Sequence, residues 1–153
     1  MTTSVSYARP SSPDPEFLAG LPRRSRLELG AYETSPRTAR GHIVRVLEEW
    51  SLPEFQDVAT LIATELLTNS VLEIAKHSWA VLPPVRLWLR GGPPGVVIFT
   101  WDPVMAAPAP RAAGERDESG RGLGIVAELS AACGFYHAAD PAGKVTWAAI
   151  TTP

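Results

Sequence analysis

The prolines of this chain constrain its fold more than any other feature, because each one lacks a backbone donor and interrupts a helix or a central strand. The chain has 15 prolines in 153 residues. They cluster near the start, at 83–84, at 93–94 and from 103 to 110, and we predict loops at these places. The remaining windows, with 45% hydrophobic residues overall, suit the helices and strands of one small domain.

Two helices are predicted before the proline pair at 83–84. Ser35 and Pro36 resemble an N-cap followed by a first-turn proline, and apolar residues then recur at helical spacing to about residue 50. Ser51 and Glu54 have the spacing of a capping box, which predicts the start of the second helix. We expect its apolar stripe to contain Val58, Ile62 and Leu72, and its polar side to contain Asp57, Thr60, Thr64 and Thr68.

The strands are predicted from alternation of apolar and polar residues. A short edge strand is expected at 26–32. Two hairpins are expected, one from strands at 85–90 and 96–101 and one from strands at 135–138 and 144–150. The chain therefore reads as an α/β domain.

The first part of the chain differs from the rest in composition. Residues 1–22 are rich in Ser, Pro and Asp and have almost no apolar period. Such a segment buries too little apolar surface to offset the entropy of ordering. We predict a disordered or loosely attached arm at 1–22, followed by the domain at 23–153.

Charge and cysteine content limit the function classes. The 14 basic and 16 acidic residues nearly cancel and form no basic stripe, so direct nucleic-acid binding is not expected. The single cysteine, Cys133, cannot form an internal disulfide, which fits a reducing compartment. No apolar run approaches the roughly 18 residues of a membrane span. We predict a cytoplasmic protein with a protein or small-molecule partner.

Glu65 and Asn69 are the first candidate functional pair. They are four residues apart on the second predicted helix, so they share a face, and we expect both to point inward. A buried carboxylate and amide need partners, and a hard cation with phosphates would satisfy both. Glu65 would then lie beside the metal and handle a proton. The same spacing is also that of an ordinary surface pair or a buried polar contact.

A glycine-rich turn is the second candidate. It runs from Ser119 through Gly120, Arg121, Gly122, Leu123 and Gly124, and a short helix is expected to follow to about residue 132. Alternate glycines let the backbone approach an anion, and the first amides of a helix attract it. Arg121 would add a positive charge for a terminal phosphate. A tight connection without a ligand would look the same, and residues 103–118 before the turn are a candidate lid.

Asp102 is the third candidate, because it ends the strand predicted at 96–101. A carboxylate there can accept a hydrogen bond from an exocyclic amine such as that of adenine. Starting a turn before Pro103 is an equally good explanation.

Four motifs in this order resemble the anti-sigma factor serine kinases of actinobacteria. They are ELLTNS at 65–70, VIFTWDP at 97–103, ESGRGLG at 118–124 and GKVTWA at 143–148. The resemblance implies the two-layer α/β sandwich of histidine-kinase-like (GHKL) ATPases, the Bergerat fold, in which a mixed sheet is covered by helices on one face. It also implies ATP and magnesium as cofactors.

The resemblance assigns roles to the candidate residues. Asn69 would hold magnesium, Glu65 would be the base that activates the attacking hydroxyl, and Asp102 would read adenine. The turn from Gly120 to Gly124, with Arg121 and Leu123, would grip the phosphates. Members bind a sigma factor and phosphorylate a serine of its antagonist, an anti-anti-sigma (STAS-type) protein. Whether this chain also forms a homodimer is left open.

The chain departs from the family pattern at several positions. Leu72 and Glu73 stand where a basic residue or a histidine is usual. Val104 and Ala106 stand where the wider group has glycines. Val145 occupies the place of an expected threonine, and the alternation of a strand would put Thr146 on the opposite face. These departures favour a second hypothesis, a catalytically degenerate domain that only captures a regulatory protein. A histidine-kinase catalytic domain fits poorly, because no helix pair with a phosphoacceptor histidine precedes it.

Overall fold

The computed structural model describes Tyr7, residues 9–109 and residues 122–152. Five strands form one sheet in the order β1-β2-β3-β5-β4. Their bounds are β1 (Arg23–Gly30), β2 (Pro84–Gly92), β3 (Gly95–Asp102), β4 (Ala132–Ala139) and β5 (Ala142–Thr151). All four pairings between these strands are antiparallel. The expected mixed sheet is therefore wrong, because every hydrogen-bonded pair of described strands is antiparallel. β3 and β4 run in the same direction, but β5 lies between them.

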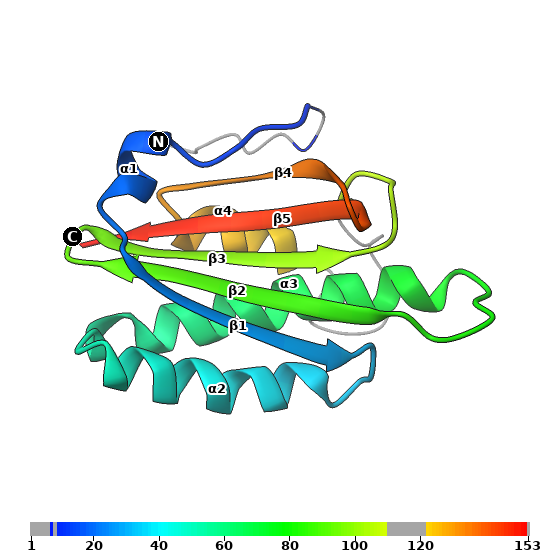
Figure 1. Ribbon diagram of the computed structural model, residues 1–153, viewed down its shortest axis with the longest axis horizontal. Coiled ribbons are helices and arrows are strands. Elements are labelled where there is room, and N and C mark those ends of the chain that lie inside the picture. Colours follow the sequence, from blue (N-terminus) through cyan, green and yellow to red (C-terminus); the bar gives the residue numbers. More distant parts are fainter. Residues whose placement is uncertain (1–6, 8, 110–121, 153) are drawn as a thin grey trace.

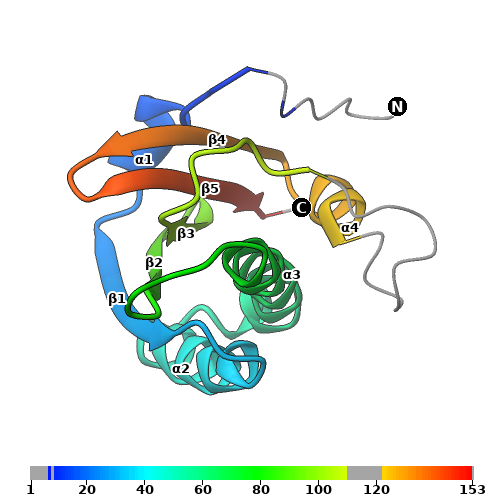
Figure 2. The ribbon, with the colours of Figure 1, turned by 90° about the vertical axis from the view of Figure 1, so that its right-hand side faces the viewer.

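Three helices cover one face of the sheet, which gives a two-layer α/β sandwich (Figures 1 and 2). They are α2 (Ser35–Glu49), α3 (Gln56–Ala75) and α4 (Gly122–Leu129). Figure 2 shows α3 between α2 and α4, with the sheet beside all three. We call the other side of the sheet the outer face.

The main core lies between the sheet and these helices. Side chains of β2 alternate between the two faces, and Val85, Leu87 and Leu89 pack into this core. The helices contribute Ile43 and Leu47 from α2, which are fully buried. The predicted edge strand and both hairpins are confirmed. The hairpin strands are longer than predicted by a few residues, and the edge strand begins at Arg23 and ends at Gly30 rather than continuing to residue 32.

The two predicted helix starts differ in detail from the structure. Ser35 is inside α2 rather than at its N-cap, and its hydroxyl accepts from the Tyr32 amide and donates to the Gly30 carbonyl. Ser51 forms no capping box, because it takes a φ of 59° in the turn between α2 and α3. A 3-10 turn, η1 (Pro53–Phe55), then leads directly into α3.

The buried stripe of α3 is shifted from the predicted one. Ile62 is buried as expected, but Leu72 is 38% exposed and Thr60 is only 6% exposed. The buried residues instead follow Ala59, Ala63, Leu66, Ser70 and Ile74. Because α3 has apolar residues on several sides, helical spacing did not define which side faces the core, and the predicted stripe was wrong.

One helical segment among the described residues, 53–75, is long and apolar enough to span a membrane. Its most apolar window is 50% buried inside the protein. This segment is the central helix of the sandwich, and a core helix meets the same criteria.

The described part of the N-terminal arm is attached to the outer face. Helix α1 (Pro15–Ala19) begins at the Asp14 N-cap, and Leu21 after it is fully buried in a second apolar cluster on this face. The Ser11 amide donates to the Phe135 carbonyl at 2.7 Å, and the Trp147 indole donates to the Ser11 carbonyl at 2.9 Å. Loose attachment is therefore wrong for residues 9–22, and residues 1–6 and 8 lie outside the described part.

Candidate functional site

Asp102 lies at the end of β3, where the sheet meets α3, and it is only 1% exposed. Its Oδ2 accepts a 2.7 Å hydrogen bond from the Ser70 hydroxyl of α3. Its Oδ1 accepts from the Lys144 ammonium at 2.8 Å and from the Val104 amide at 3.0 Å. Asp102 therefore joins β3, β5, α3 and the following loop at one point.

Lys144 is the positive partner of this carboxylate. It stands directly opposite Asp102 in the β3–β5 register and is also 1% exposed. Its ammonium donates a second hydrogen bond, at 3.0 Å, to the Val104 carbonyl. A buried ion pair of this kind persists only when both charges are paired and hydrogen-bonded, as they are here.

Asn69 lies next to this cluster, because it precedes Ser70 on α3. Its side chain is largely buried, with 8% exposure. An amide oxygen is a suitable ligand for a hard cation, so Asn69 is a candidate metal ligand.

Glu65 lies one helical turn before Asn69, about 6 Å along the axis. It is half-buried, and its Oε2 atom is shielded from solvent. Asn69 thus points inward as predicted, whereas Glu65 lies at the boundary between core and surface.

Glu65 and Asn69 lie on a different side of α3 from two threonines that face α2. Thr64 and Thr68 line a hollow of 520 Å³ together with Arg37 and Arg40 of α2. Glu65 and Asn69 follow those threonines by one residue each, which turns them by about 100° around the helix. α4 also packs against α3.

The structure describes the glycine-rich turn only in part. Gly120 and Arg121 lie outside the described residues, so their predicted phosphate contacts stay predictions. Gly122 and Leu123 begin α4 and are buried, and the Leu123 side chain belongs to the main core. Leu123 is thus an anchor for α4, and its backbone remains the part that we predict to meet phosphate.

Gly124 is different, because it is exposed in the first turn of α4. A methyl group added at this residue would meet no described atom within 4 Å. Packing against the described residues therefore does not require glycine here. Glycine in a helix is about 0.5–1 kcal/mol less favourable than alanine. Close approach of a ligand to the backbone would account for it.

The strand β5 corrects one predicted departure from the family pattern. Val145 packs on the outer face with Phe99 and Tyr136, whereas Thr146 pairs with Thr100 and shares the face of Lys144 and Asp102. We predicted that Thr146 lies on the face opposite the adenine side, but the β3–β5 register puts it on the same face as Asp102. A buried threonine is thus present beside the candidate site.

The other residues that depart from the family pattern differ in their burial. Leu72 is exposed at the surface, and Glu73 pairs with Lys76 at 3.1 Å. Val104 is buried and supplies the amide that binds Asp102. Ala106 is exposed in the loop after β3.

Lys144 and Ser70 complete the cluster around Asp102, and the sequence patterns did not indicate a role for either. The pairing of Lys144 could have been predicted, since a lysine within an otherwise apolar strand needs a buried acid as partner. The role of Ser70 could not, because serine is common on either face of a helix.

The comparisons with known proteins leave the family open. Neither a scan against protein-family models nor a search of curated proteins gave a match. No group of three or more His, Cys, Asp or Glu that could hold a metal occurs in the described residues. A magnesium ion at Asn69 would therefore take most of its ligands from water and from a bound phosphate.

Proposed function

We propose that this chain is an ATP-dependent protein serine/threonine kinase of the anti-sigma type. The observation that carries the proposal is the cluster formed by Asn69, Ser70 and Asp102. Ser70 binds the Asp102 carboxylate, for which the sequence motifs predict adenine, and the buried Asn69, for which they predict magnesium, is the next residue on α3. Residues that are 32 positions apart in the chain are joined there by a direct hydrogen bond.

Asp102 retains capacity to bind adenine. Each carboxylate oxygen can accept about two hydrogen bonds. Oδ1 accepts from Lys144 and Val104, but among the described residues Oδ2 accepts only from Ser70. One acceptor position therefore remains on Oδ2 for the exocyclic amine of adenine.

The other end of the site would hold the metal and the reacting groups. The Asn69 amide oxygen fits magnesium, and Glu65 one turn away fits a base. In the reaction the γ-phosphoryl group passes to a serine oxygen of the substrate protein, Glu65 takes the hydroxyl proton and ADP leaves. Bound magnesium would neutralise charge on the phosphates.

The partners follow from the same proposal. The chain binds a sigma factor in the cytoplasm, and phosphorylation of a serine on an anti-anti-sigma (STAS-type) protein prevents that protein from displacing the sigma factor.

The kinase reaction is tested with a copurifying antagonist protein and radiolabelled ATP. Wild-type protein is expected to label a serine of the antagonist. Glu65→Ala is expected to bind ATP with similar affinity but to lose transfer, because positioning survives when the base is removed. Equal transfer by wild type and Glu65→Ala would refute the role of Glu65.

A second candidate function is a non-enzymatic module that captures a regulatory protein. The buried Lys144 ammonium favours it, because three hydrogen bonds already occupy the Asp102 carboxylate. In this case ATP does not bind at millimolar concentration, whereas the protein partner does. Robust phosphorylation of a partner serine would exclude it.

A further inference from the structure

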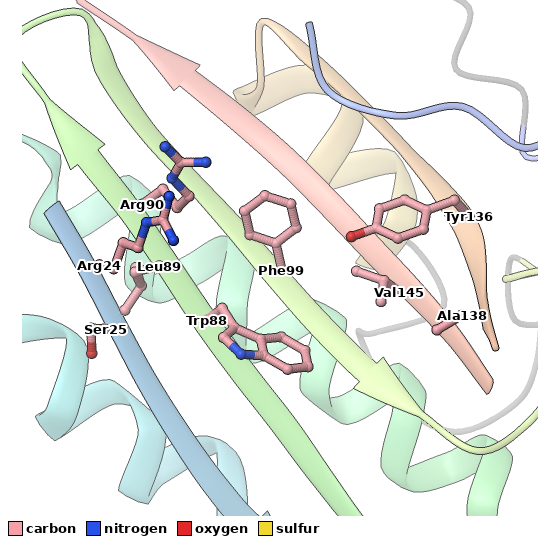
Figure 3. Close-up of a pocket in the computed structure, with 9 residues that line it drawn as sticks. All are labelled: Arg24, Ser25, Trp88, Leu89, Arg90, Phe99, Tyr136, Ala138 and Val145. Atoms are coloured by element: carbon pink, nitrogen blue, oxygen red, sulfur yellow. The ribbon is translucent and has the colours of Figure 1, made fainter. Parts of the chain in front are cut away.

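The outer face of the sheet carries a pocket that the proposed kinase reaction does not use. The N-terminal segment covers one part of this face through Leu21. Beside it lies an open pocket of 390 Å³ (Figure 3). Its side chains include Arg24, Arg90, Trp88, Phe99, Tyr136 and Val145. The volume and the aromatic lining fall within the range of small-molecule sites.

Two arginines form the charged side of this pocket. Arg24 of β1 stands directly opposite Arg90 of β2, so the two side chains share the outer face. Figure 3 shows both guanidinium groups on the same side of the aromatic rings. Like charges in this position destabilise a sheet, and an anion between them would remove the repulsion.

Neither arginine is neutralised by an acid within the described residues. The Arg90 guanidinium is fixed by the Leu18 carbonyl at 2.8 Å and the Leu21 carbonyl at 2.9 Å, which are neutral acceptors. Glu28, on the same strand as Arg24, is already paired with Arg86 at 3.3 Å. The pocket therefore has a fixed positive charge at one end.

Aromatic side chains form the rest of the pocket. Trp88 stands directly opposite Phe99 in the β2–β3 register, and Tyr136 stands opposite Val145 in the β4–β5 register. Trp88 and Tyr136 are half-buried and keep accessible ring surface, whereas Phe99 is buried at 9% exposure and lies at the floor of the pocket. The Arg26 guanidinium lies 5.8 Å from the centre of the Trp88 ring, so a ligand ring would use the rest of the Trp88 surface. Burial also raises the pKa of Tyr136 above its usual value, which keeps its hydroxyl neutral.

We propose that this pocket binds a small planar aromatic anion, whose ring lies against Trp88 and Phe99 and whose carboxylate or similar group lies at Arg24 and Arg90. Flat rings stack favourably on aromatic side chains, and guanidinium groups bind carboxylates with strong hydrogen bonds. The site lies on the opposite face of the sheet from Asp102 and Asn69. It therefore stands whether or not the chain binds ATP.

The probe for this site is 2-naphthoate, measured by isothermal titration calorimetry with the full chain. We expect saturable binding at one site and at least tenfold weaker binding of the neutral 2-naphthamide. Arg24→Gln should weaken naphthoate binding about tenfold. Arg23→Gln is the matched control, because this neighbouring exposed arginine projects to the other face and should leave binding unchanged.

The ring contact is tested separately with Trp88→Ala, for which Trp79→Ala at a distant surface position is the control. Only Trp88→Ala should reduce naphthoate binding. The melting temperature of each variant checks that it is folded. Absence of binding to wild type at millimolar naphthoate would overturn the proposal, as would equal binding by wild type and Arg24→Gln. Self-association of wild type that Trp88→Ala abolishes in sedimentation experiments would also overturn it, because the face would then join two copies.

Discussion

Asp102 and Lys144 are the residues on which the architecture of the candidate site depends most. Both are 1% exposed, and their 2.8 Å contact links the end of β3 to the start of β5. Removing one charge leaves the other buried without its partner, whereas removing both avoids that cost. The stability losses of the two single variants should therefore not add in the double variant, whereas the losses of two residues that only pack in the core would add.

We predict that Lys144→Met destabilises the protein by about 3–5 kcal/mol, because Asp102 remains buried as an uncompensated charge. Asp102→Asn should also be costly. The double variant should lose much less stability than the sum of the two single losses, as measured by urea unfolding in a double-mutant cycle. Additive losses would contradict the buried ion pair.

A substitution at Gly124 can separate the effect of a bound ligand from the effect on stability. Gly124→Ala should raise the free energy of unfolding by about 0.5–1 kcal/mol and weaken magnesium-ATP binding, because the added methyl group lies where the ligand approaches. Gly41→Ala is the matched control, since Gly41 is also exposed on a helix with open space around it. The control should gain similar stability and bind as wild type does. Equal nucleotide affinity in both variants would count against a ligand at Gly124.

His42 gives the protein a pH dependence that its contacts explain. Its Nδ1 lies 3.2 Å from Arg45, which can only donate, so Nδ1 accepts and Nε2 donates to the Ser25 hydroxyl at 2.7 Å. Burial and the nearby Arg45 charge lower the pKa of His42 below its ordinary 6.5, with Glu49 acting in the opposite direction. The neutral ring is therefore the form that the folded state favours.

Because the folded pKa of His42 is the lower one, the unfolded chain binds the proton first as pH falls. The contribution of His42 to stability is present above pH 6.5 and is lost as pH falls below that value through the folded pKa. Urea unfolding of wild type and His42→Gln between pH 7.5 and pH 5 measures it. The stability difference between the two should change with pH, and parallel curves would refute the assignment.

At the scale of elements, the N-terminal segment differs most from what its composition predicts, because its described part packs on the sheet. Leu21 is fully buried among apolar neighbours. The Arg90 guanidinium donates to the Leu18 carbonyl of α1 and to the Leu21 carbonyl after it. The outer face of the sheet thus gains a partial third layer beside the two of the sandwich.

Leu21→Ala should therefore cost about 2–5 kcal/mol in unfolding free energy, as other buried leucines do. Leu82→Ala, at a position that is 46% exposed, is the control and should change stability little. A loss below about 0.5 kcal/mol for Leu21→Ala would mean that the segment detaches easily.

The sequence allowed prediction of the strands, two helices and the inward position of Asn69, because alternation and helical spacing are local signals. It did not allow prediction of the attached arm, since Leu21 and Phe17 find their apolar partners on strands far along the chain. The antiparallel order also depends on contacts between distant residues. The pairing of Lys144 with Asp102 and the facing of Thr146 required the β3–β5 register, which no local pattern defines.

At the scale of the whole molecule, the sheet separates two candidate sites. The helix-covered face holds Asp102, Asn69 and Glu65, and the outer face holds the aromatic pocket with Arg24 and Arg90. Ligands of the two sites should therefore bind independently unless the sheet itself changes between two arrangements.

We propose that the amide of Asn69 and the carboxylate of Asp102 belong to one magnesium-nucleotide site. Isothermal titration calorimetry of ATP, with and without magnesium, tests it on wild type and Asn69→Ala. We predict magnesium-dependent binding by wild type and its loss in Asn69→Ala, with little change in the melting temperature of the ligand-free variant. Failure of wild type to bind ATP at millimolar concentration, or unchanged magnesium dependence in Asn69→Ala, would contradict the account.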